Sequence, residues 1–182
     1  MKKKRLGLAK RVEKDRNVKG EIAELRFLER VTALGYVACR PFGNNARFDF
    51  LVEARGRITR VQVKSSWEQA ETGIYHVCCV SGAHYRHRPY VPGEIDFLAA
   101  YAAGDDVWYI VPVRKLPSYR TMRVCPRPGR TGRYERYREA WHLLEEGHNS
   151  GRVKQIWAMA STSCPQIEEE ERGPEVEEQQ TA

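Results

Sequence analysis

The chain has 182 residues, of which 41% are hydrophobic and 30% are charged, and its net charge is +7. This length allows one well-buried core and is short for two. No uncharged apolar run approaches the roughly 18 residues of a membrane-spanning helix, and the basic amino terminus lacks the apolar stretch of a secretory signal. We therefore expect one folded domain in the cytoplasm, with its five cysteines as free thiols.

The charge divides the chain into three regions. Residues 1–20 contain nine Lys/Arg and two Asp/Glu, whereas residues 165–182 contain seven Glu and one Arg. We expect a basic mobile leader over 1–16, a folded domain over 17–164 and an acidic disordered tail over 165–182. The region between the two ends is itself basic, which favours a polyanionic partner such as DNA.

The first predicted element is a helix whose apolar residues run from Val18 to Leu34. Asp15 or Asn17 can cap its start, and Gly35 is placed to end it. A short extended run at 36–40 follows, and Gly43-Asn44-Asn45 has the composition of a loop.

The next elements are predicted to be strands. Segments 48–53 and 58–63 form a hairpin around a turn at Arg55-Gly56. Segments 74–80, 95–101 and 107–113 are predicted to be further strands, and aromatic residues at helical spacing predict a closing helix over 133–146. This order of elements predicts an α/β fold with a mixed central β-sheet flanked by helices.

Candidate catalytic residues lie on the predicted hairpin. Gln62 and Lys64 share one face of the second strand, because residues two apart point the same way, and the hairpin places Asp49 beside them. Asp49, the Gln62 side-chain oxygen and the Val63 carbonyl are hard oxygen ligands that suit a divalent cation. Lys64 can orient or deprotonate a water molecule and offset charge on a phosphate.

A carboxylate of the first helix is a further candidate ligand. Glu24 lies near the middle of the apolar arc and Glu21 nearer its edge, so helical geometry favours Glu24 only modestly. A salt bridge from Glu24 to Arg47 or Arg60 is the alternative. Asp96 begins a predicted strand and either caps it or supports the site.

Three motifs resemble the PD-(D/E)xK nuclease superfamily, in particular group I intron homing endonucleases and Holliday-junction resolvases. They are Lys19-Gly20-Glu21-Ile22-Ala23-Glu24, Arg47-Phe48-Asp49 and Gln62-Val63-Lys64-Ser65-Ser66. The resemblance implies a restriction-endonuclease-like core and Mg²⁺- or Mn²⁺-dependent cleavage of DNA. It also implies catalytic roles for Glu24, Asp49, Gln62 and Lys64, with Glu24, Asp49, Gln62 and Val63 as metal ligands.

Two positions depart from the superfamily signature. Phe48 replaces a proline that supplies no ligand, and Gln62 replaces an acid. A neutral ligand leaves one negative charge fewer at the metal, although the resemblance extends to active homing endonucleases that carry glutamine there. The hypotheses are therefore a metal-dependent DNA endonuclease and, as the alternative, an inactive DNA-binding protein that keeps the nuclease fold.

An arginine-rich segment is the predicted DNA contact. Arginine suits phosphate by its planar donor fork, and proline and glycine between 126 and 129 indicate a loop. The predicted contacts are Arg120, Arg123, Arg127, Arg130 and Arg133. Cleavage of both strands would require a homodimer or a higher homo-oligomer.

Overall fold

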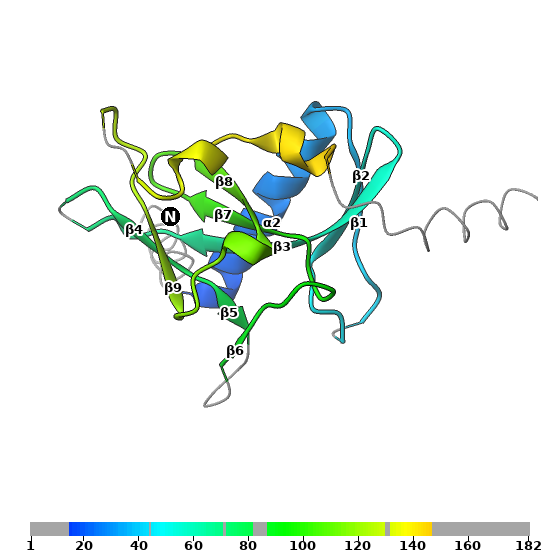
Figure 1. Ribbon diagram of the computed structural model, residues 1–182, viewed down its shortest axis with the longest axis horizontal. Helices are drawn as coiled ribbons and strands as arrows, with labels where there is room; N and C mark the ends of the chain where they lie inside the picture. The colour runs from blue at the N-terminus through cyan, green and yellow to red at the C-terminus, as the bar shows by residue number, and fades with distance from the viewer. Residues whose placement is uncertain (1–14, 44, 71, 82–86, 130–131, 147–182) are drawn as a thin grey trace, which may run out of the picture. The chain divides into compact units, whose positions relative to one another are not determined.

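The computed structural model describes residues 15–146 except 44, 71, 82–86 and 130–131. Nearly all of the expected leader (1–16), the segment 147–164 and the expected tail (165–182) lie outside the described residues. The described chain is built on a central five-stranded sheet in the order β1-β2-β3-β7-β8 (Figure 1). Its strands are β1 (Val37–Cys39), β2 (Phe50–Ala54), β3 (Arg57–Ser66), β7 (Phe97–Ala102) and β8 (Val107–Pro112).

The central sheet is mixed, as the sequence predicts. β3 and β7 run parallel, with Val61 opposite Phe97, and the other neighbouring pairs are antiparallel. The β2–β3 hairpin turns at Arg55 and Gly56, which both have positive φ angles of 50° and 76°. Two consecutive positive φ angles are typical of the type I′ turn that joins twisted strands closely.

Helix α2 (Arg16–Ala33) is bounded by the residues expected to bound it. The Asp15 side chain accepts hydrogen bonds from the backbone N–H groups of Asn17 and Val18. At the other end Gly35 has a φ angle of 79°, its N–H donates to Thr32 O, and the Tyr36 N–H donates to Val31 O. This pair of hydrogen bonds is a Schellman motif, which satisfies carbonyls that the helix leaves unpaired.

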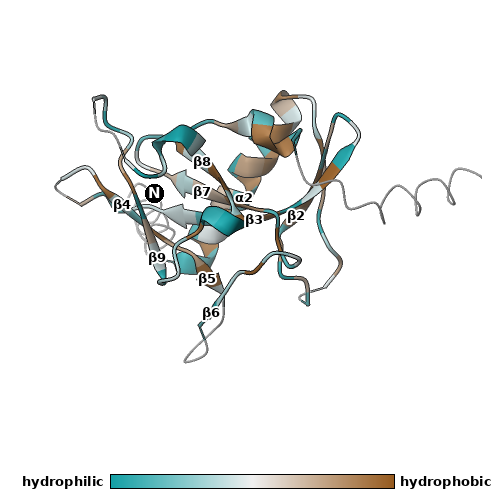
Figure 2. Ribbon diagram, viewed as in Figure 1, coloured by the Kyte–Doolittle hydropathy of each residue, from teal (hydrophilic) through white to brown (hydrophobic). Residues whose placement is uncertain are grey.

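The α2 face of the sheet holds one hydrophobic core. Phe27 is fully buried there, with its ring centroid 5.2 Å from that of Phe50 and 5.7 Å from that of Trp108. Figure 2 shows apolar and polar stretches interleaved along α2, as expected for a helix with one buried face.

The opposite face is covered by a small second sheet, where the sequence predicted helices on the flanks. β4 (Tyr75–Cys78) pairs antiparallel with β9 (Thr121–Val124), and Val77 and Met122 are buried against β7 and β8 residues such as Leu98. The sequence predicted no strand at β9, which ends just before the loop predicted over 126–129. A short ladder of β5 (Val80–Ser81) with β6 (Arg88–Pro89) lies beyond β4.

The predicted closing helix over 133–146 is wrong. The segment holds only two 3₁₀ turns, η2 (Glu135–Tyr137) and η3 (Trp141–Leu144); a third, η1 (Val113–Lys115), follows β8. Glu139 has a positive φ of 47°, and it exchanges two hydrogen bonds with the Trp108 N–H and carbonyl. This segment therefore closes the β8 edge of the sheet, and its left-handed residue interrupts any continuous helix.

Within the described ranges no helix is both long and apolar enough to cross a membrane. Cys39, Cys78, Cys79 and Cys125 are free thiols, as expected, and Cys164 lies outside the described residues.

Candidate active site

The predicted catalytic residues gather where β3 extends beyond β2. Residues 57–61 of β3 pair with β2, whereas residues 61–66 pair with β7 on the other side. Asp49 directly precedes β2, and its N–H donates to Val61 O at 2.9 Å. Beyond this point the β2 side of β3 is an open edge, and Val63, two residues after Val61, faces it.

The Asp49 carboxylate fills this open edge. Its Oδ2 accepts the Val63 N–H at 2.8 Å and the Gln62 Nε2 group at 2.5 Å. The Gln62 amide nitrogen also lies 3.3 Å from Val63 O. The structure therefore brings Asp49, Gln62 and the Val63 carbonyl together, and Gln62 is buried there with 7% of its surface exposed.

The charged form of Asp49 is disfavoured by its surroundings. Burial raises the pKa of the Asp49 carboxyl above its ordinary value, and this effect exceeds the opposing effects of the Val63 hydrogen bond and the Lys64 charge. A nearby cation would stabilise the charged form of such a carboxylate.

Helix α2 contributes Glu24 to the same edge. Burial and then the negative charge of Asp49 raise the pKa of Glu24, so the two carboxylates lie within electrostatic reach of each other. The Glu24 side chain is 22% exposed, whereas Glu21 is an exposed residue. Of the two helix candidates, Glu24 is the less exposed, and its pKa responds to the Asp49 charge.

Lys64 lies on the face of β3 that carries Gln62. Its cross-strand neighbour on β7 is Ala100, and its ammonium group lies within electrostatic reach of Asp49, Glu24 and the buried thiol of Cys79. A positive charge is thus held beside two carboxylates.

Arg40 is a site residue that the sequence reasoning missed. Its guanidinium forms an ion pair with Glu24 and lies 5.5 Å from the Phe50 ring centroid. The expected alternatives for this ion pair are wrong, because Arg47 pairs with Glu94 and Arg60 with Asp96. The β1–β2 register provides the signal, since Cys39 opposite Leu51 brings the next residue, Arg40, toward Phe50.

Asp96 is engaged by the backbone and side chain of Arg60. It accepts from the Arg60 N–H at 2.8 Å, from Nε at 3.1 Å and from Nη2 at 3.0 Å. These bonds fasten the start of β7 to β3. Asp96 therefore has the position of a structural residue that holds the sheet together.

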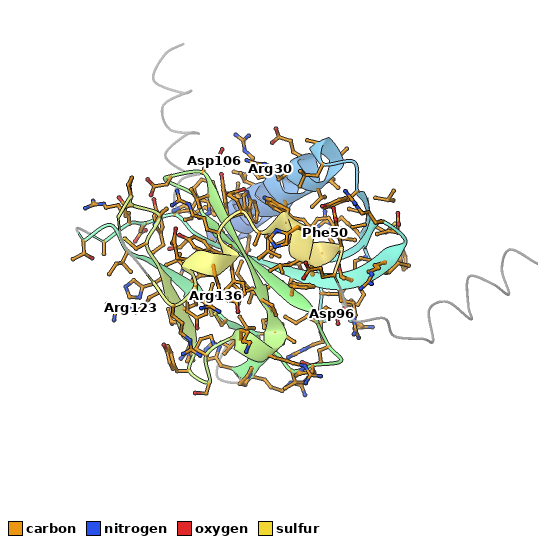
Figure 3. All side chains as sticks on the ribbon, turned by 45° about the horizontal axis from the view of Figure 1, so that its top comes forward. Arg30, Phe50, Asp96, Asp106, Arg123 and Arg136 are labelled. Carbon is orange, nitrogen blue, oxygen red and sulfur yellow. The ribbon has the colours of Figure 1, made fainter. Side chains whose placement is uncertain are left out.

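The predicted DNA-contacting arginines are dispersed. Arg123 lies on β9 opposite His76, and Figure 3 shows it well apart from Phe50, the residue that follows Asp49. Arg127 lies so close to Gly73 that a side chain at that glycine would overlap it, and Arg133 lies over the Tyr134 ring. Arg120 is exposed and donates to His87 Nε2 at 2.6 Å. Arg130 lies outside the described residues.

The donor set fits a hard divalent cation. The Asp49 carboxylate, the Val63 carbonyl and the Gln62 amide meet here, and the Glu24 carboxylate lies within electrostatic reach. Rotation of the Gln62 amide exchanges its nitrogen and oxygen positions. Across the described ranges no group of three or more His, Cys, Asp or Glu side chains could hold a metal ion. At this edge the third side chain is the neutral Gln62.

One protein family and one solved structure match this chain. The model of the PD-(D/E)XK endonuclease family matches residues 14–144. The solved structure of a bacterial homing endonuclease, I-Ssp6803I, is similar with a TM-score of 0.61 and 29% sequence identity, over 82% of this chain and 99% of that one. No protein with a curated description matches. The matched residues include Glu24, Asp49, Gln62 and Lys64.

Proposed function

The chain belongs to the PD-(D/E)XK endonuclease family, and on that premise we propose that it is a Mg²⁺- or Mn²⁺-dependent DNA endonuclease. The observation that supports this most is the convergence of Asp49, Gln62 and Val63 at the open edge of β3. The Glu24 carboxylate of α2, whose pKa is raised by burial and by the Asp49 charge, supports it as well. These four residues would hold the cation.

A cation at these ligands would polarise the phosphate and lower the pKa of a bound water molecule. The protein's own contribution begins with the two carboxylates, whose raised pKa values reflect burial and, for Glu24, repulsion by Asp49. The cost of holding two negative charges together falls when a positive ion is shared between them.

Lys64 has the second role. Its ammonium group can donate hydrogen bonds to a phosphate oxygen and offset the charge that develops on the phosphate. In its neutral form it can accept a proton from the attacking water. Both roles require a position beside the carboxylates, which Lys64 has.

Cleavage of DNA tests the proposal. Purified protein is incubated with supercoiled plasmid and with branched DNA in Mg²⁺, Mn²⁺, Ca²⁺ or a chelator, and we expect products only with Mg²⁺ or Mn²⁺. Lys64→Ala should abolish cleavage and keep DNA binding. Lys115→Ala is the matched control, because Lys115 is an exposed lysine of η1 outside the site.

An inactive DNA-binding protein is the second candidate. The observation that favours it is Gln62, which leaves the centre with two carboxylates and donates its amide to one of them. Binding of DNA by the unmutated protein without cleavage, across all substrates and metals, would establish this alternative and overturn the nuclease.

A further inference from the structure

Two arginines converge on one carboxylate beside the candidate centre. Arg47, two residues before Asp49, donates to Glu94 Oε2 at 3.1 Å, and Arg88 of β6 forms an ion pair with Glu94 Oε1. The three charges do not cancel, because one carboxylate faces two guanidinium groups. This cluster retains an excess positive charge.

Arg47 is held in a fixed position. Its guanidinium lies 5.4 Å from the centroid of the buried Tyr90 ring, and its side chain is 31% exposed. Its Nε is buried and has no hydrogen-bond partner among the described residues. An arginine ordered in advance loses less conformational freedom when it binds an anion.

The positive surface continues from this cluster toward β9. Arg88 is 62% exposed, its neighbour His87 is exposed, and His87 Nε2 accepts from the exposed Arg120. Arg47, Arg88 and Arg120 come from three separate parts of the chain. Contacts through Glu94 and His87 link the three arginines into one series that begins two residues before Asp49.

We infer that Arg47, Arg88 and Arg120 bind successive backbone phosphates of the DNA strand that leaves the cleavage centre. This phosphate track rests on the proposed function for its substrate. A repeating negative charge on the ligand matches a row of arginines, and guanidinium groups suit phosphate oxygens by their planar donor fork. Only Arg120 is shared with the arginines that the sequence predicted as DNA contacts.

The track is tested by DNA binding in Ca²⁺, measured as fluorescence anisotropy of a labelled duplex over a series of KCl concentrations. Arg47→Ala, Arg88→Ala and Arg120→Ala should each weaken binding and reduce the slope of log K against log salt by about 0.9, the value for one lost phosphate contact. Arg26→Ala and Arg114→Ala are the controls, since each removes one exposed arginine charge elsewhere.

Glu94→Gln separates the track from a folding defect. It removes the one negative charge of the cluster, so DNA binding should become tighter than in the unmutated protein, and damage to the fold cannot produce such a gain. Track variants that bind like the two controls, with an unchanged salt slope, would overturn the inference.

Different results refute the proposed phosphate track and the proposed nuclease activity. Protein that binds DNA through these arginines and never cuts it supports the track and refutes the nuclease. Protein that cuts DNA while the three variants bind like the controls refutes the track alone. Absence of any DNA binding refutes both.

Discussion

The Gln62 side-chain amide donates a hydrogen bond to the Asp49 carboxylate at 2.5 Å. Gln62, which replaces the acid of the family signature, thus contacts Asp49, which matches that signature. A second carboxylate at position 62 would repel Asp49, whereas glutamine offers it a donor. In this chain the neutral side chain relieves part of the repulsion within the centre.

Gln62→Glu should reverse this relationship. We expect the free energy of unfolding in a chelator to fall by about 1–3 kcal/mol, because a hydrogen bond is replaced by repulsion. The rise in melting temperature on adding Mn²⁺ should exceed that of the unmutated protein, since a third negative charge strengthens cation binding. Differential scanning fluorimetry measures both effects.

Gln69→Glu is the matched control for this variant. Gln69 also donates to a carboxylate, that of Asp105, at 2.8 Å. This pair is exposed; Gln69 lies between β3 and β4, and Asp105 lies in the β7–β8 turn. Its variant should leave the response to Mn²⁺ unchanged. Equal responses of the two glutamate variants would count against a cation site at Gln62.

Asp49→Asn should change how stability depends on pH. Because burial raises the pKa of Asp49, the stability that this group contributes is fully present below 3.8, its ordinary value, and is lost as pH rises through the raised value. The asparagine variant lacks this loss, so its free energy of unfolding should increase relative to that of the unmutated protein as pH rises. At neutral pH it should be at least as stable. Urea unfolding in a chelator across this range measures the difference, and a variant that is less stable at every pH would contradict it.

Asp96→Ala should weaken the fold without affecting the centre. It removes an acceptor of three bonds from Arg60, and we expect a loss of about 1–3 kcal/mol in unfolding free energy. The Mn²⁺-induced rise in melting temperature should stay as in the unmutated protein. A diminished rise would assign Asp96 to the cation site instead of the sheet.

Two glycines of the first helix region should respond oppositely to alanine. Gly35→Ala places a side chain at a φ angle of 79° and should cost about 1 kcal/mol, because it strains the Schellman motif. Gly20→Ala adds a Cβ with no atom within 4 Å inside α2, and should stabilise the protein by about 0.5–1 kcal/mol. Urea unfolding of the two variants measures these changes. If both substitutions changed the free energy of unfolding in the same direction, backbone conformation would not explain the effects.

The predictable parts of the fold are those that local sequence determines. The cap at Asp15, the stop at Gly35 and the turn at Arg55-Gly56 each depend on a few neighbouring residues, and all three are confirmed. The α/β class with its mixed sheet follows from the same local patterns and is confirmed as well.

The predictions that were wrong concern segments whose structure depends on contacts between distant residues. The spacing of Tyr134, Tyr137, Trp141 and Leu144 fits a helix, yet pairing of Glu139 with Trp108 and a left-handed backbone decide otherwise. β9 becomes a strand only because β4 lies beside it. The same limit applies to the centre: Asp49, Gln62 and Lys64 could be placed from a hairpin, whereas Arg40 required the β1–β2 register.

The open edge of β3 has a consequence for how this centre can be lost. The Val63 carbonyl and the Asp49 carboxylate meet there because β2 begins only at Phe50, opposite Val61, while β3 runs on to Ser66. If pairing continued for two more residues, the β2 backbone would take the Val63 N–H from Asp49 and cover the edge. The proposed cation site thus depends on the unequal lengths of β2 and β3. An insertion or deletion between Arg40 and Asp49 that lengthened β2 would therefore abolish the site, although every candidate catalytic side chain would still be present.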